Sequence, residues 1–292
     1  MDAAGAIKLL NIIALAALMI SIGMTIKVQQ VAESFKNVWS VAISVSVNFA
    51  IVPFATVALL TAFQPDPLVS AGFVILAVCP GAPLGPAFTR LAQGDELMST
   101  GQMVLLAGLS AVLTPALFGF FLGLTAPHSE VTPPYFPILV TLLLSQLLPL
   151  ALGFAIHHWA PELTKRTVKS VRSIANVLLV ALITLILIDQ YETLAAIRGR
   201  AWLEMAALSL ASLAIGWVSG GTDPAKRKAA ALTTATRNVA VGLVIAVGCF
   251  SGTPAVTAVI AYGLFSTLIA LICAILFNKF APPLPRETVR PL

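Results

Sequence analysis

Residues 79–86 read Cys79-Pro-Gly-Ala-Pro-Leu-Gly-Pro86, which places three prolines and two glycines inside an apolar stretch of about residues 69–92. Each proline removes a backbone N–H donor and clashes with the preceding helical turn, so no continuous helix survives here. Broken backbone at membrane depth is tolerated only where protein covers it or where it lines a cavity. The stretch therefore predicts a discontinuous membrane helix with a buried break.

The whole chain is as apolar as this stretch. Of its 292 residues, 59% are hydrophobic and only 10% are charged, whereas soluble domains carry roughly 25% charged residues. A water-soluble core could not absorb this much apolar surface without exposing large patches. Membrane lipid is therefore the expected solvent of the outer faces, and we expect an all-α integral membrane protein.

Nine apolar segments follow one another along the chain, separated by loops that carry charges or turn residues. At roughly 20 residues per spanning helix, they predict about nine transmembrane helices in a single domain, residues 1–292. The first segment has only Lys8 before its apolar run and no clear cleavage site, so we expect a retained helix. The segments run over about residues 6–26, 37–62, 69–92, 97–124, 134–158, 168–190, 200–218, 229–249 and 253–278.

The loop charges predict the orientation of the chain. Lys and Arg gather in the loops after the first, third, fifth and seventh segments and in the tail from Ala281. The other side holds Lys8, Arg198 and Arg200. Because cytoplasmic loops carry the excess of Lys and Arg, we expect a protein of the cell membrane (inner or plasma). Its N-terminus would lie outside and its C-terminus in the cytoplasm.

A second break is predicted within residues 229–249, where Thr233-Thr-Ala-Thr-Arg-Asn-Val-Ala-Val-Gly242 gathers polar side chains. The first broken segment is the third along the chain and this one is the eighth. Because successive spanning helices alternate in direction, two segments that are five apart cross the membrane in opposite orientations. Inverted repeats of about 6–124 and 168–278, joined by a linking helix of about 134–158, would cross the two broken helices near the midplane. Secondary transporters place their substrate sites at such a crossing.

Other functional classes find little support. The basic residues form no stripe with interleaved aromatics, which argues against nucleic acid. Cys79, Cys249 and Cys273 have neither a disulfide nor a metal-site spacing. No hydrolase elbow, phosphate loop or His-Glu metal motif occurs, so we expect neither an enzyme nor a cofactor. A channel or a sensor is the remaining alternative to a carrier.

The order of several short motifs resembles the bile acid:sodium symporter family. The resemblance extends from about Leu15 to Asn278. It implies a panel domain and a core domain that move relative to each other, with alternating access and two sodium sites beside the crossing. The motifs are Gly23-Met-Thr-Ile26, Asn48-Phe-Ala-Ile-Val-Pro53, Cys79-Pro-Gly81, Thr89-Arg-Leu-Ala-Gln-Gly94, Leu113-Thr-Pro115 and Thr236-Arg-Asn-Val-Ala-Val-Gly242.

The chain departs from the family at residues that the resemblance assigns to the sodium sites. Where the family has a Ser-Asn pair after the Cys-Pro-Gly break, this chain has Gly85 and Pro86. Of the two family hydroxyls on the following helix, the one at Ser99 is retained and the one at Met103 is lost.

The second broken helix departs from the family as well. The shared carboxylate of the family corresponds to Thr233 and a sodium-ligating Gln to Arg237, while Asn48 keeps an amide. Sodium needs several oxygen ligands, preferably with a carboxylate. We therefore expect the sodium sites near Asn48, Ser99 and Thr233 to be degenerate, and we assign no metal ion to them. We expect transport that does not depend on sodium.

Arg237 has three possible roles. It could be a built-in cation that replaces sodium and donates to Asn48 and to carbonyls freed at the breaks. It could bind an anionic substrate, because its planar fork suits a carboxylate or phosphate. It could instead snorkel to the cytoplasmic interface, although it follows Lys228 by roughly 13 Å of helix at 1.5 Å per residue.

The sequence thus favours a secondary transporter of a small organic anion that works by alternating access. Two alternatives stay open: a sodium-coupled symporter with a rebuilt cation site, and an efflux carrier of the wider superfamily driven by protons or membrane potential. The residues expected to line the site are Asn48, Cys79, Pro80, Gly81, Pro83, Gly85, Pro86, Ser99, Thr233, Thr236, Arg237 and Asn238.

Overall fold

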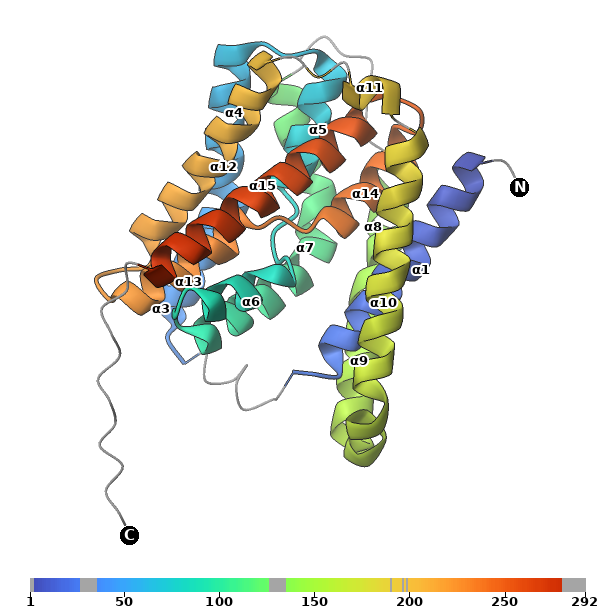
Figure 1. Ribbon diagram of the computed structural model, residues 1–292, viewed down its shortest axis with the longest axis vertical. Coiled ribbons are helices and arrows are strands. Elements are labelled where there is room, and N and C mark those ends of the chain that lie inside the picture. The colour runs from blue at the N-terminus through green and yellow to red at the C-terminus, as the bar shows by residue number, and fades with distance from the viewer. Residues whose placement is uncertain are drawn as a thin grey trace.

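The computed structural model describes residues 3–26, 36–125, 135–189, 191–195, 197 and 199–279. Within these residues every regular element is a helix, and η marks a π-helical turn (Figure 1). The tail from Ala281 lies outside the described residues. The elements are α1 (Ala3–Gly23), α3 (Val38–Ser46), η1 (Val47–Ile51), α4 (Val52–Phe63), α5 (Pro67–Ala77), α6 (Leu84–Leu91), α7 (Glu96–Thr125), α8 (Tyr135–Leu142), η2 (Leu143–Leu147), α9 (Leu148–Trp159), α10 (Pro161–Asp189), α11 (Tyr191–Ala195), α12 (Gly199–Ser219), α13 (Pro224–Ala235), α14 (Val239–Cys249) and α15 (Pro254–Lys279).

All nine predicted segments are helical, which confirms an all-α membrane protein. Among the described residues, seven helical stretches are long and apolar enough to cross a membrane. Two shorter apolar helices, Ile7–Gly23 and Pro67–Ala77, account for the first and third segments. The third falls short of a full span because its helix is interrupted, as the prolines predict.

The helices form two groups that lie side by side (Figure 1). The panel group consists of α1 and α8 to α10, in which α1 packs along both α9 and α10. The core group consists of α3 to α7 and α12 to α15, in which α12 packs on α13 and α5 on α15. The helix α14 also contacts α1 and α8, so it lies at the junction of the two groups.

Two π-helical turns interrupt long spans, and the apolar pattern gave no indication of them. Pro53 follows η1 and Pro149 follows η2, each at the start of the next helix. A proline cannot donate to the carbonyl four residues before it and clashes with that carbonyl. Widening the preceding turn accommodates the proline, and π turns of this kind concentrate at functional sites. One buried amide lies in each turn, Asn48 in η1 and Gln146 in η2.

The helix α10 begins at Pro161, seven residues before the predicted start at 168. Proline is favoured at the first helical position, where its missing N–H has no partner to lose. Glu162 and Lys165 form an ion pair one turn apart along the exposed start of the helix. These charged residues indicated a loop, but they form the first turns of an exposed helix.

The helices α1 and α9 approach closely at two glycines. A Cβ built on Gly153 would lie 2.2 Å from the backbone oxygen of Ile20, and one on Gly23 would lie 2.3 Å from that of Leu150. Small residues at membrane helix interfaces let backbones pack closely. These two glycines therefore fix how α1 sits in the panel group.

We expect Gly153→Ala to lower the thermal unfolding midpoint of the protein in detergent. The new methyl group forces α1 away from α9, and overpacking of this kind typically costs about 1–3 kcal/mol. Gly119→Ala in α7 is the matched control, because a Cβ there meets nothing within 4 Å. Equal midpoints for the two variants would contradict the close approach.

Candidate functional site

The first break in the chain separates α5 from α6 and contains Cys79, Pro80, Gly81 and Pro83. Gly81 adopts a φ of 85°, a conformation that side chains disfavour. A Cβ at this position would lie 2.4 Å from the backbone nitrogen of Ala107 in α7. Only glycine lets the broken backbone lie against α7 in this way.

Gly85 and Pro86 do not belong to this break, contrary to the predicted limits of residues 79–86. They lie in the first turn of α6, which begins at Leu84. Proline is tolerated there because first-turn N–H groups have no partner within the helix. Gly85 is buried against α13, where a Cβ would lie 3.3 Å from the Cα of Thr233 and 3.3 Å from Oγ1 of Thr236.

The second break separates α13 from α14 at residues 236–238, a shorter interruption than the predicted one. Thr236 has an extended backbone, and the side chain of Asn238 accepts a hydrogen bond from the Val241 N–H at 3.3 Å, capping α14. In an apolar stretch of 18 residues within Pro224–Cys249, 94% is buried inside the protein. This broken helix therefore has almost no contact with lipid.

The two breaks are hydrogen-bonded to each other. The backbone N–H of Asn238 donates to the carbonyl of Cys79 at 2.8 Å, and its side-chain amide donates to the carbonyl of Gly81 at 3.4 Å. Thr114 of α7 donates to the carbonyl of Val78 at 2.6 Å. Three carbonyls that the first break removes from helical bonding thus find donors, which holds the crossing together.

Arg237 lies at this crossing with only 2% of its surface exposed. Its Nη1 donates to the carbonyl of Ala77, the last residue of α5, at 3.3 Å. Its Nε and Nη2 have no partner among the described residues. A side chain this buried does not snorkel to the interface, so that role is wrong.

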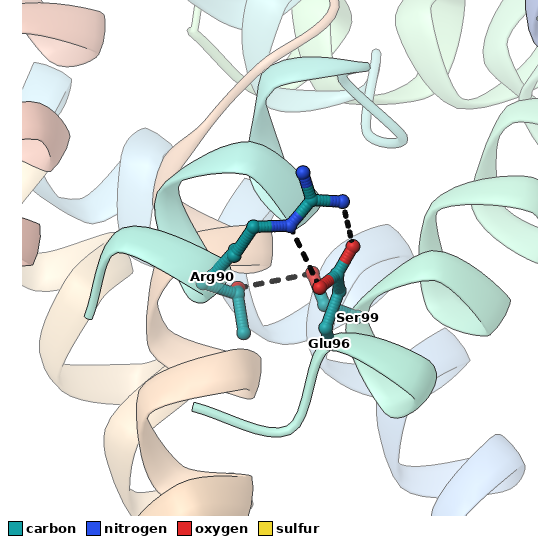
Figure 2. Close-up of polar contacts among 4 residues, drawn as sticks. Arg90, Glu96 and Ser99 are labelled. Carbon is teal, nitrogen blue, oxygen red and sulfur yellow. Dashed lines mark hydrogen bonds and ion pairs between the residues drawn. The ribbon is translucent and has the colours of Figure 1, made fainter. Parts of the chain in front are cut away.

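Three hydroxyls form a chain beside the crossing. Ser99 and Thr233 lie 2.7 Å apart, and Thr89 donates to Ser99 at 3.1 Å. Next to this chain, Arg90 forms an ion pair with Glu96 through two hydrogen bonds, which ties the end of α6 to the start of α7 (Figure 2). The sequence predicted Ser99 and Thr233 as site residues, but it gave no indication that Thr89 joins them.

Asn48 reaches the same region from η1. Its side-chain nitrogen donates to the carbonyl of Ser44 at 3.0 Å and to Oγ1 of Thr234 at 3.4 Å, while its oxygen has no partner in the described structure. The predicted bond from Arg237 to Asn48 is therefore absent. The sequence did not predict that Thr234 contacts Asn48. A helix that is buried on all sides has no sequence pattern that shows which of its residues face a given neighbouring helix.

Two cavities lie at opposite ends of the α13–α14 pair. One, of about 450 Å³, is lined by residues that include Asp223 and Lys226 at the start of α13 and Ser44 and Gln102 from α3 and α7. The other, of about 80 Å³, lies at the far end of α14 beside Cys249. Arg237 lies at the break between them.

The predicted site residues therefore come together around the two breaks, although in pairs rather than in one shell. Cys79 and Gly81 of the first break meet Asn238, and Ser99 meets Thr233. Gly85 meets Thr233 and Thr236, and Asn48 meets Thr234. Among the described residues, no group of three or more His, Cys, Asp or Glu side chains could hold a metal ion.

Comparison with known proteins gives relatives of one kind. The chain is 24% identical over 152 residues to the sodium-dependent organic anion transporter of Bos taurus, covering 52% of this chain and 40% of that protein. It is 22% identical over 208 residues to a probable chloroplastic sodium/metabolite cotransporter of Oryza sativa subsp. japonica, covering 71% and 48%. These names describe transport proteins, and the chain spans less than half of their length.

A family model also matches the chain. The model of the Sodium Bile acid symporter family matches residues 12–197, which include the second half of α1, the first broken helix and α8 to α10. This range is more than half of the 292 residues. Together with the crossing of two broken helices, it shows that the chain belongs to the Sodium Bile acid symporter family.

Proposed function

We propose that this protein is a secondary transporter that moves a small organic anion across the cell membrane by alternating access. Three features support the proposal: membership of a family of symporters, two broken helices that cross inside the core group, and a buried cation at the crossing. Discontinuous helices that meet in the middle of a membrane protein are the common architecture of transporter binding sites.

Arg237 carries this proposal. It is almost fully buried, no described carboxylate forms an ion pair with it, and two of its nitrogens have no partner. An uncompensated buried charge costs several kcal/mol, typically about 3–5 when a partner is removed. The anionic group of a substrate is the partner that supplies this compensation, because a guanidinium fork matches two oxygens at once.

We further propose that Arg237 serves as a resident cation and that transport does not depend on sodium. Its guanidinium stands where the family resemblance places a sodium-ligating Gln, and Thr233 stands where it places a carboxylate. The hydroxyls of Thr233 and Ser99 are bonded to each other. A sodium ion beside Arg237 would meet a like charge without a carboxylate to balance it.

The alternative is a sodium-coupled symporter with a rebuilt cation site. One observation favours it: the side-chain oxygen of Asn48 is buried and has no partner in the described part of the chain. A cation held by Asn48 and neighbouring hydroxyls would use that oxygen. The two functions differ in whether sodium stabilises the protein.

The alternating movement would take place between the panel and core groups. The two cavities lie beyond opposite ends of the broken helix α13–α14, and α14 lies where the groups meet. We propose that the groups are built from inverted repeats and that the larger cavity faces the cytoplasm. This orientation places the loops with most Lys and Arg inside the cell.

We expect the thermal unfolding midpoint of the purified protein in detergent to be the same in sodium chloride and in choline chloride at equal ionic strength. A ligand that binds only the folded state raises the midpoint by mass action. A rise specific to sodium would instead support the cation site at Asn48 and would sink the proposed sodium independence.

We expect Arg237→Ala to fold normally and to lose transport of any organic anion that stabilises the wild-type protein. Truncating one partner of a buried charge pair costs about 2–5 kcal/mol, and each 1.4 kcal/mol is tenfold. Uptake by reconstituted vesicles should therefore fall by roughly thirtyfold or more. Arg166→Ala on the exposed start of α10 is the control. Normal uptake by the Arg237→Ala variant would show that Arg237 does not bind the substrate.

We expect the double variant Thr233→Glu, Arg237→Gln to gain a sodium-specific rise in its unfolding midpoint. The change removes the resident cation and restores a carboxylate beside Ser99 and a neutral oxygen ligand at the second break. Single Arg237→Gln is the control and should show no rise, because it lacks the carboxylate. No rise in the double variant would mean that Arg237 does not stand in for sodium.

A further inference from the structure

The smaller cavity, of about 80 Å³, lies where the panel and core groups meet, at the end of α14 farthest from α13. Its walls come from α1, α8 and α14, and α14 contacts both α1 and α8 (Figure 1). Lys8 and Asn11 line it from α1, Thr141 from α8, and Gly248 and Cys249 from α14. None of these residues has a role at the crossing.

Asn11 is the unusual residue in this cavity. It is 1% exposed, and neither its amide oxygen nor its amide nitrogen has a partner among the described residues. Buried polar groups in native proteins are nearly always hydrogen-bonded, so an amide with both ends unpaired indicates a missing ligand or water. Asn11 lines the cavity, which is large enough to hold such a ligand or water molecule.

Lys8 adds a positive charge at the same place. It lies three residues before Asn11 on α1, hence on the same face of the helix. It lines the same cavity as Cys249. Aliphatic side chains, among them Ile12, Ile138 and Val244, form the remaining walls. A cation, an unpaired amide donor and an apolar wall together suit a carboxylate or sulfonate attached to an organic group.

The position of the cavity suggests when such an anion would bind. Val244 follows Arg237 by seven residues, about 10 Å along a helix at 1.5 Å per residue. Deeper along α1, Leu15 and Leu18 are buried in the apolar cluster that also contains Val244. Apolar packing therefore separates the cavity from the crossing in this conformation, and a movement of the panel group against the core group would join them.

We propose that Lys8 and Asn11 form an outer access site that binds the carboxylate or sulfonate of a small organic anion before it reaches Arg237. This inference rests on the proposed transport of organic anions and adds a second, peripheral binding step. It predicts that anions accumulate beside Cys249 even when the crossing is closed.

The test uses Cys249 as a reporter in purified Cys273→Ser protein, in which Cys79 is fully buried. The rate of Cys249 modification is measured with sulfonatoethyl and aminoethyl methanethiosulfonate, which carry opposite charges. Both reagents react with the same thiolate, so the ratio of their rates does not depend on the thiolate fraction. Dividing this ratio by the ratio for a free thiol removes the difference in reactivity between the two reagents. A nearby cation should raise this normalised ratio roughly fivefold or more.

We expect Lys8→Gln and Asn11→Leu each to return the ratio towards one, while Lys165→Gln, at an exposed site on α10, leaves it unchanged. Butyrate should slow modification more than chloride at equal ionic strength. A wild-type ratio near one, a ratio lowered by Lys8→Gln alone, or equal protection by chloride would overturn the proposal. Arg237→Ala should keep the high ratio, so a failure of the transport proposal remains distinguishable from a failure of this one.

Discussion

The structure depends on satisfying the carbonyl groups that the first break leaves without helical partners. Inside a membrane no water reaches them, and each unsatisfied group costs several kcal/mol. The backbone of Asn238 bonds to Cys79, its side chain bonds to Gly81, and Arg237 bonds to Ala77. The second break therefore supplies the donors that the first one needs, and neither broken helix could stand in the membrane alone.

This mutual requirement also explains why the polar residues cluster. Because α13 and α14 are surrounded by protein, their threonines, arginine and asparagine face other helices rather than lipid. The hydroxyl chain of Thr89, Ser99 and Thr233 links three helices in the same way. The positive charge of Arg237 is left without a protein counter-charge, and this imbalance gives the crossing its affinity for anions in our proposal.

Much of the fold could be predicted from the sequence, because prolines, glycines and loop charges act locally. The break after Ala77, the second break and the nine helical segments all follow from such signals. The pairing of side chains could not be predicted, since α5 and α14 are buried on nearly every face and show no periodicity that reveals their rotation. For the same reason Thr234, Thr89 and Asn11 were missed, and Gly85 and Pro86 were placed in the break although they begin α6.

The burial of α13 has a consequence for how the chain is held in the membrane. Its first five residues, Pro-Ala-Lys-Arg-Lys, carry three positive charges, which partition poorly into lipid. Gly216 of α12 packs against the α13 backbone, and Lys228 of α13 donates to the carbonyl of Ala92 just beyond α6. We therefore expect this end of α13 to be stabilised in the membrane by protein contacts with α12 and α6, and not by lipid.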